Sequence, residues 1–360
     1  MVQFATLKYM PVLIFRRAEV KAVDKLYGPQ KDLLFPLFRI RPWGRKDLDK
    51  TFEKARAIMG HRNFACDFDD YYNPDSSTSN AAAQYKKLTK AKDLNPWYNK
   101  LLAYDEIVPC IRLDPDLSQI VASANRPDIV ERGFGLVIRL DQSQLILKLL
   151  EVLDQIAHNN FFVMIDSGWS RDVLGQASAA SALAASIINK KPETTVFLSS
   201  TSFPKSFSKV GVNSTVPLPE FNLVDSVNAQ LAQTTNLGAV KYSDWATTRP
   251  PGGAGGGDWI PRIDVPEIDK VRMYRDRIKA TESSAQTCQR LAAFAVSNSN
   301  WPSPPPSWGH YSIDLTASGG EHGIYSAQAN SATRINIHLH NVLSAGEAGP
   351  PATGEEPFEG

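Results

Sequence analysis

Arginine and aspartate side chains recur at every second position in two short segments of the chain. In FGLVIRLD the alternating residues end in Arg139 and Asp141, and in VPCIRLD they end in Arg112 and Asp114. Guanidinium groups bind carboxylate and phosphate groups through paired hydrogen bonds. Carboxylates transfer protons or coordinate Mg²⁺. This combination is typical of a site for an anionic ligand, and it leaves open whether the site is catalytic.

Further charged residues share this spacing in other apolar segments. Alternate residues of a strand point to the same side of a sheet, so we expect all of these side chains to face one interior. The candidate catalytic residues are Asp67, Asp69, Asp114, Asp141 and Asp166, and the candidate ligand-binding residues are Arg16, Arg39, Arg41, Arg112 and Arg139. The expected ligand is an anionic small molecule or a nucleotide, and Mg²⁺ is the cofactor that such aspartates suit.

One stretch of the chain predicts how these residues are positioned. Phe134–Asp141 is an apolar run of strand length, and Phe161–Trp169 is a second one. Between them, Leu145, Leu149 and Leu153 recur every four residues, which predicts a helix with one apolar face. A strand, an amphipathic helix and a strand form a βαβ unit, in which the two strands lie parallel.

The rest of the chain repeats this unit and predicts a TIM-like (β/α)8 barrel over residues 1–249. Eight strands that alternate with helices over about 245 residues match the size of that fold. The predicted strands are Tyr9–Arg16, Leu33–Arg41, Phe64–Tyr72, Val108–Asp114, Phe134–Asp141, Phe161–Trp169, Thr194–Pro204 and Ala239–Trp245. A Gly-rich loop is expected at 250–258, an α+β segment packed on the barrel at 259–343, and a disordered acidic tail at 344–360.

In a barrel of this kind the carboxyl ends of the strands form the mouth, where barrel enzymes place their sites. Two hypotheses remain open for the charges there. One is an enzyme that acts on an anionic ligand, which needs at least one carboxylate without an arginine partner. The other is a catalytically silent module that binds a ligand or a protein partner, in which every carboxylate is paired. A buried ion-pair network that only plugs the barrel is the structural alternative, although burying charges is a poor way to gain stability.

Composition limits the classes of partner. Lys and Arg number 39 against 38 Asp and Glu, a net charge of +1, so no general nucleic-acid binding and no membrane binding are expected. The three cysteines are far apart and form no CxxC pair, which favours buried thiols in a reducing compartment. No segment has the length of a membrane span, and we expect a cytoplasmic protein.

Two histidines near the end of the chain raise the question of a metal site. His338 and His340 lie in RINIHLHNV, whose alternation predicts a strand with both side chains on one face. Such a pair can bind a metal ion, but packing against the barrel is the more common role. We therefore assign no metal ligands.

The order of several short motifs resembles the phage and bacterial "beta" protein family, over nearly the whole chain. These motifs are YMPVLIFRRAE, FPLFRI, FACDFDDYY, VMID, FLSSTSFP, YSDWATTRP, SWGHYSI and RINIHLHNV. Family members tend to have a lysine, a glutamate and an aspartate where this chain has Ile14, Arg39 and His310. The resemblance implies a barrel-like fold, a helix at RINIHLHNV and a link with phage or mobile-element biology. It implies no reaction.

Overall fold

The computed structural model of the chain describes residues 2–207, 210–234, 239–249 and 259–345. The loop predicted at 250–258 and the predicted tail beyond residue 345 lie outside the described residues. Contacts divide the chain into two compact units. The barrel unit contains residues 1–16, 31–204 and 219–251, and the second unit contains residues 17–30, 205–218 and 252–360. The packing of segment 259–343 on the barrel stays a prediction.

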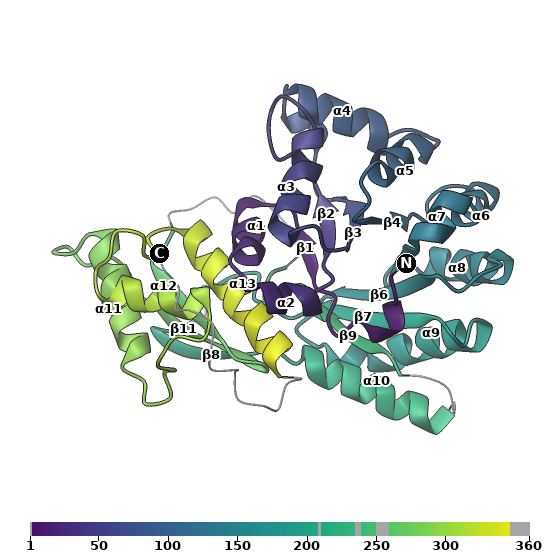
Figure 1. Cartoon of the computed structure of the whole chain (residues 1–360). Coiled ribbons are helices and arrows are strands. Elements are labelled where there is room, and N and C mark those ends of the chain that lie inside the picture. The colour runs from purple at the N-terminus through teal and green to yellow at the C-terminus, as the bar shows by residue number, and fades with distance from the viewer. Residues whose placement is uncertain (1, 208–209, 235–238, 250–258, 346–360) are drawn as a thin grey trace. The chain divides into compact units, whose positions relative to one another are not determined.

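The barrel unit is built from eight strands that are parallel to their neighbours and follow one another around the sheet (Figure 1). This confirms the predicted TIM-like α/β barrel. The strands are β1 (Val12–Ile14), β2 (Leu37–Ile40), β3 (Phe64–Phe68), β4 (Ile107–Ile111), β5 (Phe134–Arg139), β6 (Phe161–Trp169), β7 (Thr195–Thr201) and β9 (Lys241–Asp244). Each apolar run in the sequence therefore corresponds to one strand, at the predicted place in the order.

Side chains close the seam between the last strand and the first. In the described chain no backbone ladder joins β9 to β1. Instead, Lys241 Nζ donates a hydrogen bond to the carbonyl oxygen of Leu7 over 2.9 Å. The hydroxyl of Tyr9 donates to Asp244, and its ring stacks on Tyr242 with the centroids 5.7 Å apart. The barrel is thus nearly closed, and its seam depends on polar side chains.

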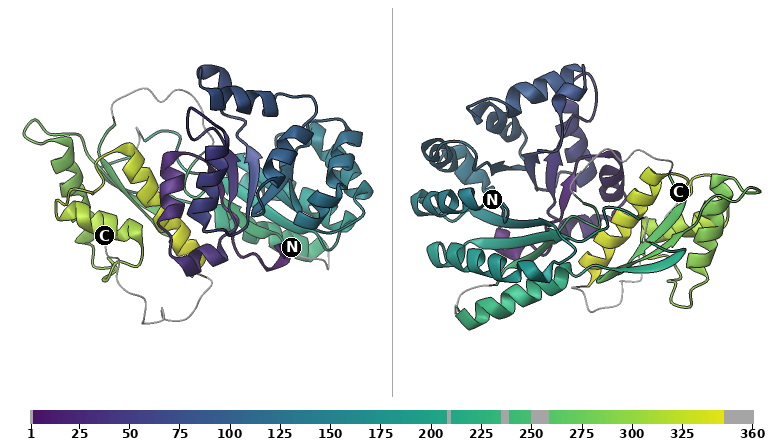
Figure 2. Two further views of the ribbon diagram at one scale, coloured as in Figure 1. Left: turned by 45° about the horizontal axis from the view of Figure 1, so that its top comes forward. Right: turned by 180° about the vertical axis from the view of Figure 1, so that it is seen from behind.

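Helices cover the outside of the strands. Figure 2 shows the teal helices α8 and α9 lying against the outer side of the sheet. The barrel unit contains α3 (Asp49–Met59), α4 (Asn80–Thr89), α5 (Asn95–Leu102), α6 (Leu117–Ala124), α7 (Pro127–Arg132), α8 (Ser143–Gln155), α9 (Ala177–Lys190) and α10 (Glu220–Thr234). Because one face of each strand meets these helices, the other face points into the barrel.

The interior of the barrel is filled by the residues of one parity on each strand. The buried cluster includes Val12, Ile14, Leu37, Ala65, Val108, Cys110, Phe162, Met164, Phe197 and Trp245. On β2 the next residue of this parity after Leu37 is Arg39, and on β6 the next after Met164 is Asp166. The apolar interior therefore changes to a charged layer toward the carboxyl ends of the strands.

The second unit is a three-stranded antiparallel sheet with helices. The strands lie in the order β10 (Arg262–Pro266), β11 (Lys270–Arg275) and β8 (Asn213–Pro217). The helices are α1 (Arg17–Asp24), α11 (Ser284–Val296), α12 (Trp308–Ala317) and α13 (Ala327–Ser344), while α2 (Gly28–Leu33) spans the boundary between the units in the sequence. Three separate stretches of chain thus fold together in this unit.

The strand predicted at RINIHLHNV is wrong, because this stretch lies within helix α13. Ser326 caps the helix by accepting a hydrogen bond from the backbone N–H of Ala329, and all residues from Ala332 to Leu339 are buried. The alternation therefore does not mark one polar and one apolar face. On a helix, two residues at i and i+2 do not share a face, so His338 and His340 are not arranged as a pair of ligands.

The described residues contain neither a membrane-spanning helix nor a cluster of metal ligands. None of their helices is long and apolar enough to cross a membrane. Nor do three or more histidine, cysteine or acidic side chains there converge in a way that could hold a metal ion.

An ion pair at the amino end of β4 yields a prediction about acid stability. Glu106 accepts hydrogen bonds from Arg56 Nε and Nη2 at 2.7 and 2.9 Å, which lowers the pKa of its carboxyl group to about 2 although burial opposes this shift. A lowered carboxyl pKa adds stability that is complete above the unfolded pKa of about 4.5 and disappears as the pH falls toward 2. Glu106→Gln should cost about 1–3 kcal/mol at pH 7. Urea denaturation at a series of pH values should show this loss of unfolding free energy becoming smaller as the pH falls from about 4.5 toward 2.

The neighbouring carboxylate of Asp105 offers a control. It is fully exposed at 98% and pairs with Arg132 over 3.3 Å. Asp105→Asn should change the free energy of unfolding by less than about 0.5 kcal/mol, both at pH 7 and as the pH falls toward 2. Equal pH dependence in both variants would contradict the assignment of the acid response to Glu106.

Candidate functional site

The charged layer lies at the carboxyl ends of strands β2 to β6. The strand register pairs Arg39 of β2 with Asp67 of β3, and Arg139 of β5 with Asp166 of β6. Arg112 follows directly after β4. The local cause is the same on each strand, since an apolar residue of inward parity is followed two residues later by a charged one. The parallel order then brings these side chains to one mouth.

Arg39 is the deepest charge in this layer and is only 3% exposed. Its Nη1 atom donates a hydrogen bond to Asp70 Oδ2 over 3.1 Å and lies 3.7 Å from Asp67 Oδ2. Its Nη2 atom lies 4.0 Å from Asp166 Oδ2. Burial alone would lower the pKa of Arg39, but the three carboxylates raise it. The guanidinium group is therefore fixed in its charged form.

Arg112 joins three carboxylates to the same cluster. Its Nη1 donates to Asp67 Oδ2 over 3.2 Å and to Asp70 Oδ2 over 3.0 Å, and its Nη2 donates to Asp70 Oδ1 over 2.8 Å. Its Nε donates to Asp114 over 3.0 Å. The guanidinium plane also lies over the ring of Phe68, 4.3 Å from the centroid. Burial alone would lower the pKa of Arg112, but the carboxylates of Asp67, Asp70 and Asp114 raise it well above its usual value.

The two aspartates shared by these arginines differ in their electrostatics. Asp67 is 1% exposed, and burial raises the pKa of its carboxyl group despite Arg112 and Arg39. Burial also acts on Asp70, but there Arg112 and Arg39 prevail and lower the pKa of the carboxyl group. Asp70 therefore stays ionised more readily than Asp67.

Asp166 is held differently from the other carboxylates of the layer. Its Oδ1 accepts hydrogen bonds from the backbone N–H of Gly168 over 2.9 Å and from Trp245 Nε1 over 3.2 Å. Its nearest arginine contact is the 4.0 Å approach of Arg39. Neutral donors thus orient this buried carboxylate, and its arginine contact is the weakest of the cluster.

The outer rim of the mouth is formed by more exposed pairs. Arg139 makes an ion pair with Asp141, whose side chain is 64% exposed, and donates to the hydroxyl of Tyr71 over 3.3 Å. Asp114, the outer partner of Arg112, is 56% exposed. The three arginines and Asp67, Asp70 and Asp114 line a cavity of about 30 Å³. This volume corresponds to about one water molecule.

The structure brings together most of the predicted site residues but not all. Seven of the ten predicted residues lie in the layer and rim described above, namely Arg39, Arg112, Arg139, Asp67, Asp114, Asp141 and Asp166. Arg41 and Asp69 instead form their own ion pair, with Nε 2.9 Å from Asp69 Oδ2, and Arg41 lies over the ring of Tyr72. Arg16 is half-buried just after β1 and is not among the residues that line the cavity.

Asp70 is the residue of this cluster that the sequence analysis missed. Strand β3 ends at Phe68, and the chain then turns, with the N–H of Tyr72 bonded to the carbonyl oxygen of Asp69. Alternation no longer holds beyond the strand, so Asp70 reaches the arginines while Asp69 points elsewhere. Two adjacent aspartates at a strand end are the signal that would have included it.

The charge balance of the mouth is acidic. Five aspartates face three arginines, an excess of two carboxylates. The aspartates are Asp67, Asp70, Asp114, Asp141 and Asp166, and the arginines are Arg39, Arg112 and Arg139. Each of the five still has an arginine nitrogen within 4.0 Å. The arrangement can therefore exchange ion-pair partners, and it offers no carboxylate without an arginine nearby.

Comparison with known proteins identifies relatives of this chain. The model of a family described as "Beta protein" matches residues 9–344. A protein of Enterobacteria phage P4 called "Protein beta" is 24% identical over 362 residues, which cover 96% of this chain and 96% of that protein. The similarity therefore extends over both units.

The different settings of Asp70 and Asp166 predict different costs of neutralisation. Asp70→Asn removes a charge that Arg39 and Arg112 stabilise and should cost about 1–3 kcal/mol of unfolding free energy. Asp166→Asn keeps an oxygen for Gly168 and Trp245 and should cost less than about 1 kcal/mol. Chemical denaturation of both variants at pH 7 measures the difference. Equal costs would show that the 4.0 Å contact of Asp166 with Arg39 is a full ion pair.

Proposed function

The chain belongs to the Beta protein family, and from this premise we propose that its barrel is a catalytically silent binding module. The module captures a small anionic ligand, a carboxylate, a phosphate or a nucleotide, at the carboxyl-terminal mouth. The relative from phage P4 supports a role in the biology of phages or other mobile elements. The three described cysteines are free and buried, which supports a cytoplasmic location in this proposal.

The observation that carries the proposal is the exposure of the rim ion pairs. Asp114 and Asp141 are 56% and 64% exposed, whereas their partners Arg112 and Arg139 are 16% and 33% exposed. Exposed ion pairs contribute only about 0–1 kcal/mol, so exchanging one carboxylate for another costs little. A ligand carboxylate or phosphate would replace the rim aspartates and use the same guanidinium forks. The deeper charges would stay in place and orient these forks.

The burial and pairing of the inner carboxylates, Asp67 and Asp166, favour binding over catalysis. A general base needs an accessible oxygen near the proton that it removes. Asp67 is buried between two arginines, and the oxygen atoms of Asp166 face Trp245, Gly168 and Arg39. Mg²⁺ gains no support either, since the described residues contain no acidic cluster that could hold a metal ion.

A structural plug is the competing role for the same residues. The cavity of about 30 Å³ favours it, because an anion larger than water enters only if the rim aspartates move. The two roles differ in what neutralising a rim aspartate does. In a plug it removes a partner and gains nothing, whereas in a binding site it removes a competitor of the ligand.

Calorimetric titration of the full chain with inorganic phosphate, citrate and ADP tests the proposal. We expect at least one of these anions to bind. Asp141→Asn should strengthen its binding by about threefold to tenfold, because the competing carboxylate is gone. Arg139→Gln should weaken its binding by at least about tenfold, because one guanidinium fork is lost.

Arg126 provides a matched control for these variants. Its side chain is 23% exposed and pairs with Asp128 over 2.6 Å, and neither residue lines the mouth cavity. Arg126→Gln and Asp128→Asn should leave anion binding unchanged. Absence of binding for all three anions, with the wild-type chain folded, would favour the structural plug.

A further inference from the structure

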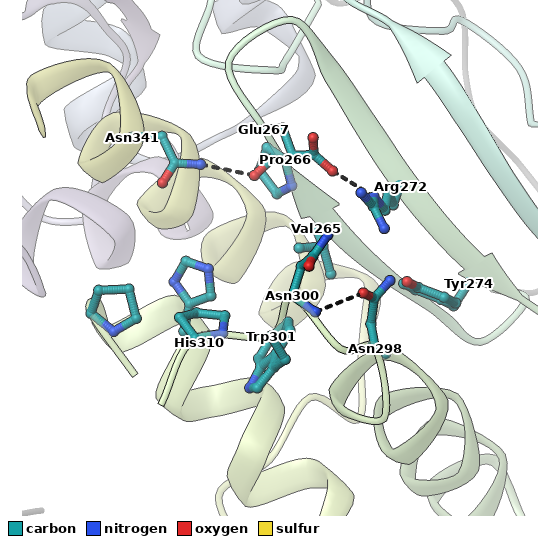
Figure 3. Close-up of a pocket in the computed structure, with 13 residues that line it drawn as sticks. Val265, Pro266, Glu267, Arg272, Tyr274, Asn298, Asn300, Trp301, His310 and Asn341 are labelled. Atoms are coloured by element: carbon teal, nitrogen blue, oxygen red, sulfur yellow. Dashed lines mark hydrogen bonds and ion pairs between the residues drawn. The ribbon is translucent and has the colours of Figure 1, made fainter. Parts of the chain in front are cut away.

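The second unit contains a cavity of about 400 Å³ that the charged mouth does not involve. Its walls come from β10, β11, the end of α11, the loop that follows it, α12 and α13, so they lie far apart in the sequence. The volume falls within the range of about 300–1,000 Å³ that is usual for small-molecule sites. Figure 3 shows aromatic, amide and proline side chains around this hollow.

The aromatic ring of Trp301 is fixed at the wall of the cavity. Its Nε1 donates a hydrogen bond to Asp314 over 2.8 Å, and its backbone N–H donates to the carbonyl oxygen of Asn298 over 2.9 Å. The ring of His310 packs edge-on against it at 5.3 Å. Pro302 and Pro306 extend the apolar wall. A ring held in this way gives a stacking surface that needs no reorganisation on binding.

Amide groups at the edge of the cavity have unused hydrogen-bonding capacity. Asn341 donates through Nδ2 to the carbonyl oxygen of Pro266 over 2.9 Å, which leaves its Oδ1 as an acceptor without a partner among the described residues. Asn298 accepts through Oδ1 from the backbone N–H of Asn300 over 3.0 Å, which leaves both hydrogens of its Nδ2 as donors. The two oriented amides therefore present an acceptor and a donor.

His310 adds a polar ring to the cavity wall from helix α12. The hydroxyl of Ser307 lies 2.9 Å from His310 Nδ1 and also accepts the backbone N–H of His310. The Ser307 hydroxyl can donate to Nδ1 or accept from it, so the proton of a neutral ring lies on Nε2 or on Nδ1. Burial and the neighbouring His340 lower the pKa of His310 to about 4, so the ring is neutral at pH 7. Among the described residues, the only charged side chains that line the cavity are Arg272 and Glu267, which pair with each other.

We propose that this cavity binds a nucleobase, stacked on Trp301 and hydrogen-bonded at its edge by Asn298 and Asn341. A nucleobase is planar and uncharged and carries donors and acceptors around its edge, which matches an aromatic wall, neutral amides and an internally balanced ion pair. The base belongs to a free nucleoside or to a single-stranded nucleic acid. This inference is independent of the anion site proposed for the barrel mouth.

The proposal is tested by titrating the full chain with adenosine, guanosine, cytidine and uridine and monitoring binding by ligand-observed NMR. We expect one or more of these nucleosides to bind. Trp301→Leu removes the stacking ring and should weaken binding by at least about tenfold. Asn300→Trp places bulk at the cavity wall and should have a similar effect, and it leaves the backbone hydrogen bond of residue 300 in place.

Ser299→Trp is the matched control, because Ser299 is exposed, adjacent and absent from the lining of the cavity. It should bind nucleosides like the wild type, as should Arg139→Gln at the barrel mouth. Thermal melts establish that each variant is folded.

A second arm uses single-stranded DNA tetramers. The tetramers could bind where free nucleosides do not. If Trp301→Leu and Asn300→Trp abolish that binding, the result would support the proposal and identify nucleic acid as the source of the base. The proposal is overturned if neither nucleosides nor tetramers bind, or if binding survives both cavity variants.

Discussion

A buried guanidinium group is the constraint on which the mouth of this barrel depends. Arg39 lies at the end of an apolar interior with 3% exposure, and arginine keeps its charge in a protein. Its charge is compensated by Asp67, Asp70 and Asp166, which come from β3, the turn after it and β6. Arg112 then balances Asp67 and Asp70. One inward arginine thus requires a network that spans several strands.

Burial decreases outward through this network, and with it the cost of exchanging partners. The ion pairs of Asp67 are nearly inaccessible, whereas Asp114 and Asp141 are more than half exposed. A buried charge that loses its partner costs several kcal/mol, but an exposed pair contributes about 0–1 kcal/mol. The buried ion pairs stay fixed while the exposed pairs can exchange partners, and this combination provides both rigidity and access for a ligand. Such an arrangement suits recognition of an anion more than proton transfer.

The second unit uses the same physical principle at a different place. Asp264 is fully buried and receives Arg334 Nη1 at 2.6 Å and Asn330 Nδ2 at 2.9 Å, with Arg262 Nε at 2.7 Å. The two arginines outweigh burial and lower the pKa of Asp264, and the contacts join β10 to α13. Helix α1 follows β1 in the chain but packs against α13, and β8 pairs with β11. The second unit therefore depends on two segments inserted within the barrel sequence and on one that follows it.

The sequence by itself determined the barrel and most of its charged layer. Period-two alternation depends only on the geometry of a strand, so Arg39, Arg112, Arg139 and Asp166 could be assigned to the interior from their spacing. Only the tertiary structure decided what happens beyond the strands. Asp70 reaches the arginines through a turn, and the alternation in RINIHLHNV marks no strand because polar and apolar residues alike are buried from Arg334 to Leu339. The cavity beside Trp301 likewise joins residues from five elements and a loop, and such long-range proximity leaves no local pattern in a sequence.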